Sequence, residues 1–161
     1  MLTLSLLRHA KSSWDEPGLS DHERPLAKRG LKAAPRIGAA LSGMGLKPDL
    51  VLCSDAVRAR ETLSLILPAF SAPPPQVVYE DLVYMAMPAA LLMRIRSIKA
   101  GHADRTPRHV MIVGHNPGLE ELAIMLLIGT GADDDLIRIA EKFPTCAVAR
   151  SEEHTSELQS R

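Results

Sequence analysis

The stretch that decides the fold is Leu-Thr-Leu-Ser-Leu-Leu-Arg-His-Ala at residues 2–10, an apolar run that ends at two basic side chains. Residues 2–7 are short, apolar and free of glycine and proline, so they predict a buried strand. Arg8 and His9 follow directly. In folds with a parallel sheet, ligands bind beyond the carboxyl ends of the strands. The stretch therefore predicts a buried strand that presents two basic residues at a ligand-binding edge.

The same pattern recurs twice further along the chain. Residues 49–53 predict a strand followed by Ser54 and Arg58, and residues 108–113 predict a strand followed by His115. Helical spacing, bounded by proline and glycine, predicts helices over residues 29–41, 54–67 and 88–99 and from 116 onward. Short strands are predicted at residues 76–79 and 145–149. Alternating strands and helices, with strands apolar on both faces, predict an α/β fold whose mostly parallel sheet is covered by helices.

Composition sets the broad class of protein. The chain of 161 residues is the size of one domain, and its 19 basic and 19 acidic residues cancel, which gives no reason to expect a nucleic acid or membrane partner. Cys53 and Cys146 lie far apart without a CxxC pattern, so neither a zinc site nor a disulfide framework is indicated. We expect no metal and no cofactor.

The chain also carries no sign of a membrane segment or a targeting signal. The apolar run at residues 123–128 is far shorter than the roughly 20 residues that a spanning helix needs. Residues 1–7 meet Arg8 without a basic leader, so they do not resemble a secretory signal. These features predict a cytoplasmic protein.

The composition of the chain changes after Ala149. Residues 150–160 read Arg-Ser-Glu-Glu-His-Thr-Ser-Glu-Leu-Gln-Ser, and this peptide can be read back into a DNA sequence that resembles a common sequencing-library adapter. We therefore expect a single domain over residues 1–149, with its last strand truncated, and a non-native tail over residues 150–161 outside the fold. The alternative is a solvated native tail.

Four residues at predicted strand ends point to phosphoryl chemistry, although each alone has an ordinary explanation as a structural or solvated side chain. Together, Arg8, His9, Arg58 and His115 would form one pocket rich in positive charge and hydrogen-bond donors. Such a pocket suits phosphoryl transfer, because fixed donors stabilise the negative charge on the three equatorial oxygens. Arginine supplies a rigid fork for those oxygens, and a neutral imidazole can attack phosphorus.

Four elements of the sequence resemble those of the histidine phosphatase superfamily. Leu7–Ser12 looks like its RHG/RHA signature, Ser54–Thr62 resembles its SxxxRAxxT element, and Val113–Asn116 resembles the element with the second histidine. Asp21–Leu26 is similar to the DxxRPL segment of the small SixA-like phosphohistidine phosphatases. The resemblance runs in order over residues 2–149 and implies a three-layer α/β/α sandwich of the phosphoglycerate mutase-like kind.

The resemblance also implies roles for particular residues. His9 would form the phosphohistidine intermediate, while Arg8, Arg58 and His115 would bind the phosphoryl oxygens. Arg58 is preferred to Arg60 because the Arg-Ala-x-x-Thr spacing selects it.

The general acid is the weakest part of this pattern. Larger members of the family carry a glutamate acid on an insertion, for which this chain has too few residues. Glu80, with Asp81 beside it, is the candidate acid, although a solvated carboxylate is the favoured interpretation. Arg24 either borders the pocket or forms a surface ion pair, and Asn116 is either a phosphate contact or a helix cap.

These observations predict a metal-independent phosphatase that acts through a phosphohistidine intermediate, with phosphohistidine on a protein as the favoured substrate. A weak acid disfavours alkyl phosphates, whose alkoxide leaving groups need a proton. The alternatives are a phosphatase for a small phosphorylated metabolite or nucleotide, and a non-catalytic phosphate-binding module. The expected partner is accordingly a phosphorylated protein or a small phosphorylated substrate.

Overall fold

The structure is a computed structural model that describes residues 2–101, 107–128, 130 and 132–153. Within these residues, one sheet is formed by β1 (Leu2–Arg8), β2 (Leu50–Ser54), β3 (Gln76–Glu80), β4 (His109–Gly114) and β5 (Val148–Glu153). The α-helices are α1 (Lys28–Gly43), α2 (Val57–Ile66), α3 (Pro88–Gly101), α4 (Gly118–Leu127) and α5 (Asp133–Glu141). None of the described helices is both long enough and apolar enough to cross a membrane.

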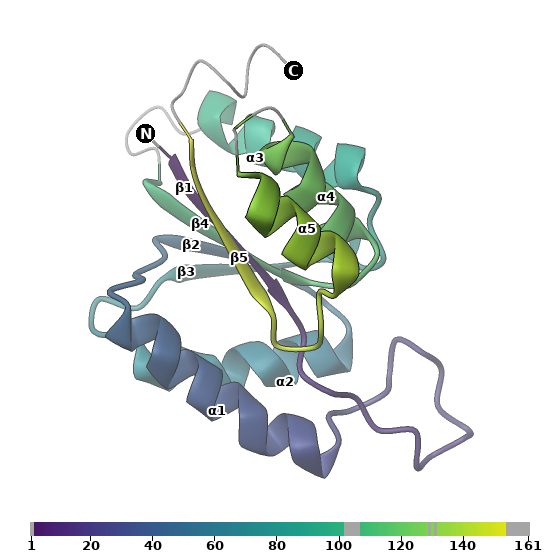
Figure 1. Cartoon of the computed structure of the whole chain (residues 1–161). Helices are drawn as coiled ribbons and strands as arrows, with labels where there is room; N and C mark the ends of the chain where they lie inside the picture. The colour runs from purple at the N-terminus through teal and green to yellow at the C-terminus, as the bar shows by residue number, and fades with distance from the viewer. Residues whose placement is uncertain (1, 102–106, 129, 131, 154–161) are drawn as a thin grey trace.

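The sheet has the order β3-β2-β4-β1-β5, in which all neighbouring strands are parallel except β5, which runs antiparallel to β1. Helices α1 and α2 cover one face, and α3, α4 and α5 cover the other (Figure 1). The predicted three-layer α/β/α sandwich with a mostly parallel sheet is therefore confirmed.

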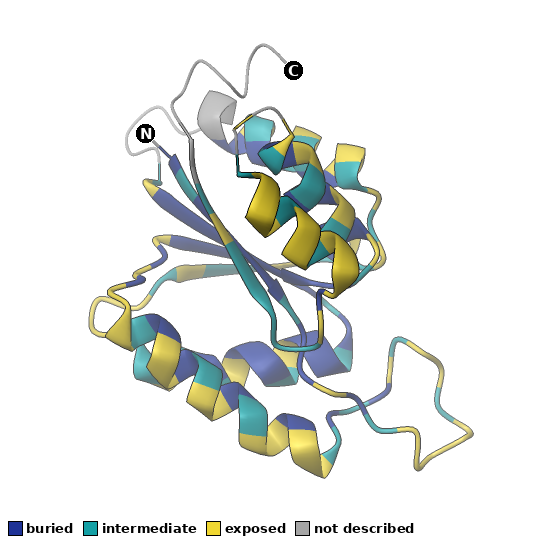
Figure 2. Cartoon of the chain, viewed as in Figure 1, coloured by how far each residue is buried: buried dark blue, intermediate teal, exposed yellow. Residues whose placement is uncertain are grey.

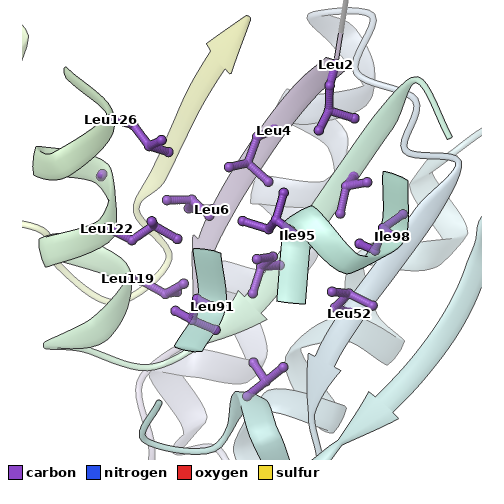
Figure 3. Packing of buried hydrophobic residues seen from close by; sticks show 14 of the residues in the cluster. Leu2, Leu4, Leu6, Leu52, Leu91, Ile95, Ile98, Leu119, Leu122 and Leu126 are labelled. Carbon is purple, nitrogen blue, oxygen red and sulfur yellow. The ribbon is translucent and has the colours of Figure 1, made fainter. Parts of the chain in front are cut away.

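Aliphatic side chains form a core on each face of the sheet, because successive residues of a strand point to opposite faces. On one face, Leu4 and Leu6 of β1 pack with Ile95 of α3 and Leu122 of α4 (Figure 3). On the other face, Leu7 belongs to a second cluster that α1 and α2 cover. Figure 2 shows the resulting pattern, in which the central strands are buried and the outer faces of the helices are exposed. This burial on both sides explains why β1, β2 and β4 read as nearly continuous apolar runs.

The last strand differs from the sequence-based expectation. β5 begins at Val148 and continues through Glu153, with Arg150 opposite Ser5 and Ser151 opposite Leu4. The exclusion of residues 150–153 from the fold was therefore wrong. Pairing at a sheet edge uses backbone N–H and C=O groups, so a polar segment can occupy the edge of β1. Residues 154–161 lie outside the described residues, and the non-native origin of the tail stays a prediction.

Candidate active site

The carboxyl ends of β1, β4 and β2 meet at one edge of the sheet, where Arg8 lies opposite Gly114 in the strand register. The residues that follow these strands come together there. The side chains of His9, Arg58 and His115 are buried, and the rings of the two histidines lie 5.0 Å apart between centroids. The parallel topology thus brings residues from distant parts of the sequence into one cluster, as their positions after the strands predict.

The ring of His9 is protonated on one nitrogen only, as a nucleophile requires. Its Nδ1 lies 2.7 Å from the carbonyl oxygen of Ala10, which can only accept, so Nδ1 carries the ring proton and Nε2 keeps its lone pair. Burial lowers the pKa of His9 to about 4, opposed by the Ala10 hydrogen bond and assisted by the charges of Arg58, Arg8 and Arg24. The imidazole is therefore neutral at pH 7, and its Nε2 is available to attack an electrophile.

Arg58 lies between the two histidines and donates to both. Its Nε is 3.3 Å from Nε2 of His9, and its Nη2 is 3.2 Å from Nδ1 of His115. Because a guanidinium only donates, Nδ1 of His115 must be an acceptor, and Nε2 carries the proton that it donates to Ser54 Oγ at 2.7 Å. Burial, together with the neighbouring His9 and Arg58, lowers the pKa of His115 to about 3. In this state the two imidazoles are neutral and Arg58 carries the charge between them.

Thr62 explains the spacing of the second sequence element. Its Oγ1 accepts a hydrogen bond from the backbone N–H of Ala10 at 2.9 Å and donates to the carbonyl of Arg58 at 2.6 Å. The threonine therefore joins α2 to the segment that carries His9. Arg58 points into the cluster from the buried face of α2, whereas Arg60 is exposed and lies over the ring of Tyr79 at 4.8 Å. The structure brings Arg58 to the cluster and leaves Arg60 outside it.

Arg8 is held by the segment that precedes β5. Its Nη1 donates to the carbonyl oxygen of Phe143 at 2.7 Å, and Asn116 donates to the same oxygen at 3.2 Å and to Glu120 at 2.6 Å. Within the described part of the chain, Nε of Arg8 is buried without a hydrogen-bond partner. This donor is available to an oxygen of a bound anion.

Ser54 opens a predicted helix and Asn116 is a candidate cap, but neither side chain caps a helix. The residue that precedes α2 is Ala56 and the one that precedes α4 is Pro117, and neither makes a side-chain cap. Ser54 instead accepts the hydrogen bond from His115, and Asn116 is bonded to Phe143 and Glu120. The cap alternative for Asn116 is therefore wrong, because local sequence does not show that Phe143 and Glu120 compete for the same side chain.

Asp21 and Tyr84 are the residues of the cluster that the sequence analysis did not assign to it. Asp21 Oδ2 accepts from Arg58 Nη2 and from the Tyr84 hydroxyl, both at 2.8 Å. The ring of Tyr84 also lies edge-on to His115, with centroids 5.3 Å apart. Arg24 is buried, donates to Ser12 Oγ at 2.6 Å and lies 3.1 Å from Asp21 Oδ1, so it borders the cluster. Neither Asp21 nor Tyr84 follows a strand directly, so strand-end position gave no signal for them.

Glu80, the candidate acid, is bonded away from the histidines. Both of its oxygens accept from Arg94 on α3, at distances of 2.5–3.0 Å. The side chain is only 13% exposed, so it is not the solvated carboxylate that the sequence favoured. Asp81, the neighbouring candidate, is exposed at the start of a 3₁₀ turn, Asp81–Val83. The structure shows no bond from either carboxylate to His9 or His115.

Gly118 lets α4 approach the loop that carries Tyr84. A Cβ on Gly118 would lie 1.9 Å from the carbonyl oxygen of Ala86, which is backbone and cannot rotate away. We expect Gly118→Ala to lower the free energy of unfolding by about 1–3 kcal/mol, the usual effect of overpacking. The matched control is Gly43→Ala, where no atom lies within 4 Å of the added Cβ. Urea denaturation followed by circular dichroism measures both; equal stabilities would contradict the close approach.

Comparison with known proteins places this geometry in a family. Residues 4–86 match the sequence model of the histidine phosphatase superfamily (branch 1). An uncharacterized protein of Mycobacterium tuberculosis (strain ATCC 25618 / H37Rv) is 38% identical over 144 residues, which cover 89% of this chain and 84% of that protein.

Solved structures agree with the sequence match. A protein of Agrobacterium tumefaciens, reported as a "putative phosphohistidine phosphatase SixA", is 32% identical with a TM-score of 0.79, over 92% of this chain and 90% of that one. A protein histidine phosphatase SixA in complex with tungstate shares the fold at 20% identity, with a TM-score of 0.75 over 96% of this chain and 90% of that one. We conclude that the chain belongs to the histidine phosphatase superfamily and is a SixA-like phosphatase.

Proposed function

We propose that this chain is a metal-independent phosphatase that removes the phosphoryl group from phosphohistidine on a protein. The observation that carries the proposal is the contrast between the groups in the cluster. It offers a neutral imidazole with an unprotonated Nε2 and several guanidinium donors, but none of the described carboxyl groups beside it is held in its protonated form. The resemblance to the Agrobacterium tumefaciens protein supports the same substrate class.

The carboxyl groups near the cluster are unsuited to protonate a leaving group. Glu80 is engaged by Arg94. Burial alone would raise the pKa of Asp21, but hydrogen bonds from Tyr84 and Arg58 and the charge of Arg24 lower it below its usual value. An alkoxide is a poor leaving group without a proton, whereas an imidazole departs more readily. The site therefore favours phosphohistidine over alkyl phosphate monoesters.

The reaction would proceed in two steps. Nε2 of His9 attacks phosphorus and the bond from phosphorus to the substrate ring breaks; that ring, already protonated on its other nitrogen, takes the bonding electron pair and leaves as a neutral imidazole. Water then attacks the phosphorus on His9, which releases inorganic phosphate and restores the imidazole. Arg8, Arg58 and His115 stabilise the charge on the three phosphoryl oxygens in both steps, as fixed donors do in phosphoryl transfer.

The test is a series of rates across substrates of graded leaving-group pKa, from phosphohistidine protein and aryl phosphates to glycerol phosphate. We expect turnover to fall steeply as the leaving group becomes more basic, because no group supplies the proton. Glu80→Gln and Asp81→Asn should leave this dependence of turnover on leaving-group pKa unchanged. If turnover depended only weakly on leaving-group pKa and the dependence became steep in Glu80→Gln, Glu80 would be a working general acid. Small phosphate monoesters would then be the favoured substrates.

The same assay tests metal independence. Among the described residues, no group of three or more histidine, cysteine, aspartate or glutamate side chains is arranged to hold a metal ion. Turnover is expected to survive a chelator unchanged. Loss of activity that a divalent ion restores would contradict this part of the proposal.

A further inference from the structure

Asp21 contacts three side chains around the cluster, although the two-step reaction gives it no role. Its Oδ2 accepts hydrogen bonds from Arg58 Nη2 and the Tyr84 hydroxyl, and its Oδ1 forms an ion pair with Arg24 Nη1. Its backbone carbonyl accepts from Arg58 Nη1. The loop between β1 and α1 thus places a carboxylate and a carbonyl against the outer edge of the guanidinium of Arg58.

These bonds determine which donors of Arg58 face the histidines. With Nη1 and one N–H of Nη2 directed to Asp21, Nε and the other N–H of Nη2 are directed to His9 and His115. A guanidinium is planar and its five N–H groups have a fixed arrangement, so anchoring one edge orients the other. Asp21 therefore sets the direction of the donors that meet a phosphoryl group on His9.

The carboxylate also offsets charge. Arg24 and Arg58 are both buried, and each is within hydrogen-bond distance of Asp21, whose side chain is 49% exposed. Their neighbours His9 and His115 are neutral in the free protein. Without Asp21, the two guanidiniums would have no carboxylate bonded to them in the described structure, and any anion in the site would bind more tightly.

On the basis of the proposed function, we propose that Asp21 is a positioning residue for phosphoryl transfer. It orients Arg58 towards His9 and His115, and its charge prevents the cluster from retaining the product phosphate. The two effects act in opposite directions on affinity and on rate. A residue that only supported the fold would change both in the same unfavourable direction.

The test is Asp21→Asn, which keeps the shape of the side chain and removes its charge. We expect the inhibition constant of inorganic phosphate to fall about twofold to fivefold, the scale of a partly exposed ion pair. We expect kcat on an aryl phosphate to fall about tenfold or more, because Arg58 is no longer held. Unchanged constants, or weaker phosphate binding together with a lower kcat, would overturn the proposal.

Asp15→Asn is the matched control, since Asp15 lies in the same loop, is exposed and makes no side-chain hydrogen bond or ion pair in the described structure. It changes the net charge equally and should leave both constants unaltered. If Asp21→Asn does not fold, Tyr84→Phe carries the test, because it removes one donor to Asp21 and leaves the carboxylate. We then expect a kcat lowered about threefold with an unchanged phosphate inhibition constant, the scale of one lost hydrogen bond; any other result contradicts the proposal.

These outcomes are separable from failure of the proposed function. If the wild-type protein hydrolysed no phosphorylated substrate, the proposed function itself would be wrong. If the wild-type protein is active and Asp21→Asn behaves like Asp15→Asn, only the role of Asp21 is wrong.

Discussion

Replacing His9 by alanine is expected to abolish turnover, with a loss of about 10⁴-fold or more, because it removes the atom that accepts the phosphoryl group. His9 follows β1 directly, and because its Nδ1 donates to Ala10, its Nε2 carries no proton and faces Arg58 Nε at 3.3 Å. His115 is not equivalent to His9, since its Nε2 carries the ring proton and donates it to Ser54.

The measurement combines steady-state rates with a rapid quench. Wild-type protein mixed with substrate and quenched in base should carry acid-labile phosphate on His9, whereas His9→Ala should carry none. Circular dichroism establishes that the variant is folded. Turnover near the wild-type rate in His9→Ala would rule out the covalent route.

Replacing Arg58 by alanine is expected to lower kcat by about 100-fold or more, the effect of losing a charge-assisted donor to the transition state. Arg58 is 3% exposed and lies between both histidines. The matched control is Arg60→Ala, two residues along the same helix, where an exposed arginine over a tyrosine ring contributes little to the site.

Rates on one aryl phosphate, with both variants at equal folded concentration, decide between the two arginines. Arg58→Ala should lose rate while Arg60→Ala stays within about twofold of the wild type. A larger loss in Arg60→Ala would show that the second sequence element has been aligned two residues out of place.

Much of this site follows from the sequence because its chemistry lies at strand ends. Apolar runs identify β1, β2 and β4, and the carboxyl ends of neighbouring parallel strands necessarily meet at one edge of the sheet. The positions of Arg8, His9 and His115 therefore followed from the strands alone. Arg58 needed the additional Arg-Ala-x-x-Thr spacing, which the structure explains through the two hydrogen bonds of Thr62.

Asp21 and Tyr84 could not be placed in the same way. Asp21 lies in the middle of a long loop, and Tyr84 follows a 3₁₀ turn, Asp81–Val83, rather than a strand. Their contact joins residues 63 positions apart, and nothing in local spacing encodes such a pair. The ion pair of Glu80 with Arg94 was missed for the same reason.

Two elements of the fold were also beyond the sequence analysis, for different reasons. Helix α5 was not predicted, although three aspartates in its first turn are typical of a helix start. The helix has only nine residues and buries none of them fully, so it contributes little to the apolar core from which the other elements were recognised. The extension of β5 through Glu153 depends on backbone pairing with β1, to which side-chain patterns are insensitive.

The short contact between Nδ1 of His9 and the carbonyl of Ala10 fixes more than a protonation state. An imidazole can be phosphorylated at either nitrogen, which gives two regioisomers with different chemical stability. Since Nδ1 already holds its proton against a main-chain oxygen, the new phosphorus–nitrogen bond can form only at Nε2. One peptide carbonyl, provided by the backbone rather than by any side chain, thus selects the regiochemistry of the covalent intermediate. That choice persists through any substitution at Ala10 that leaves the main chain in place.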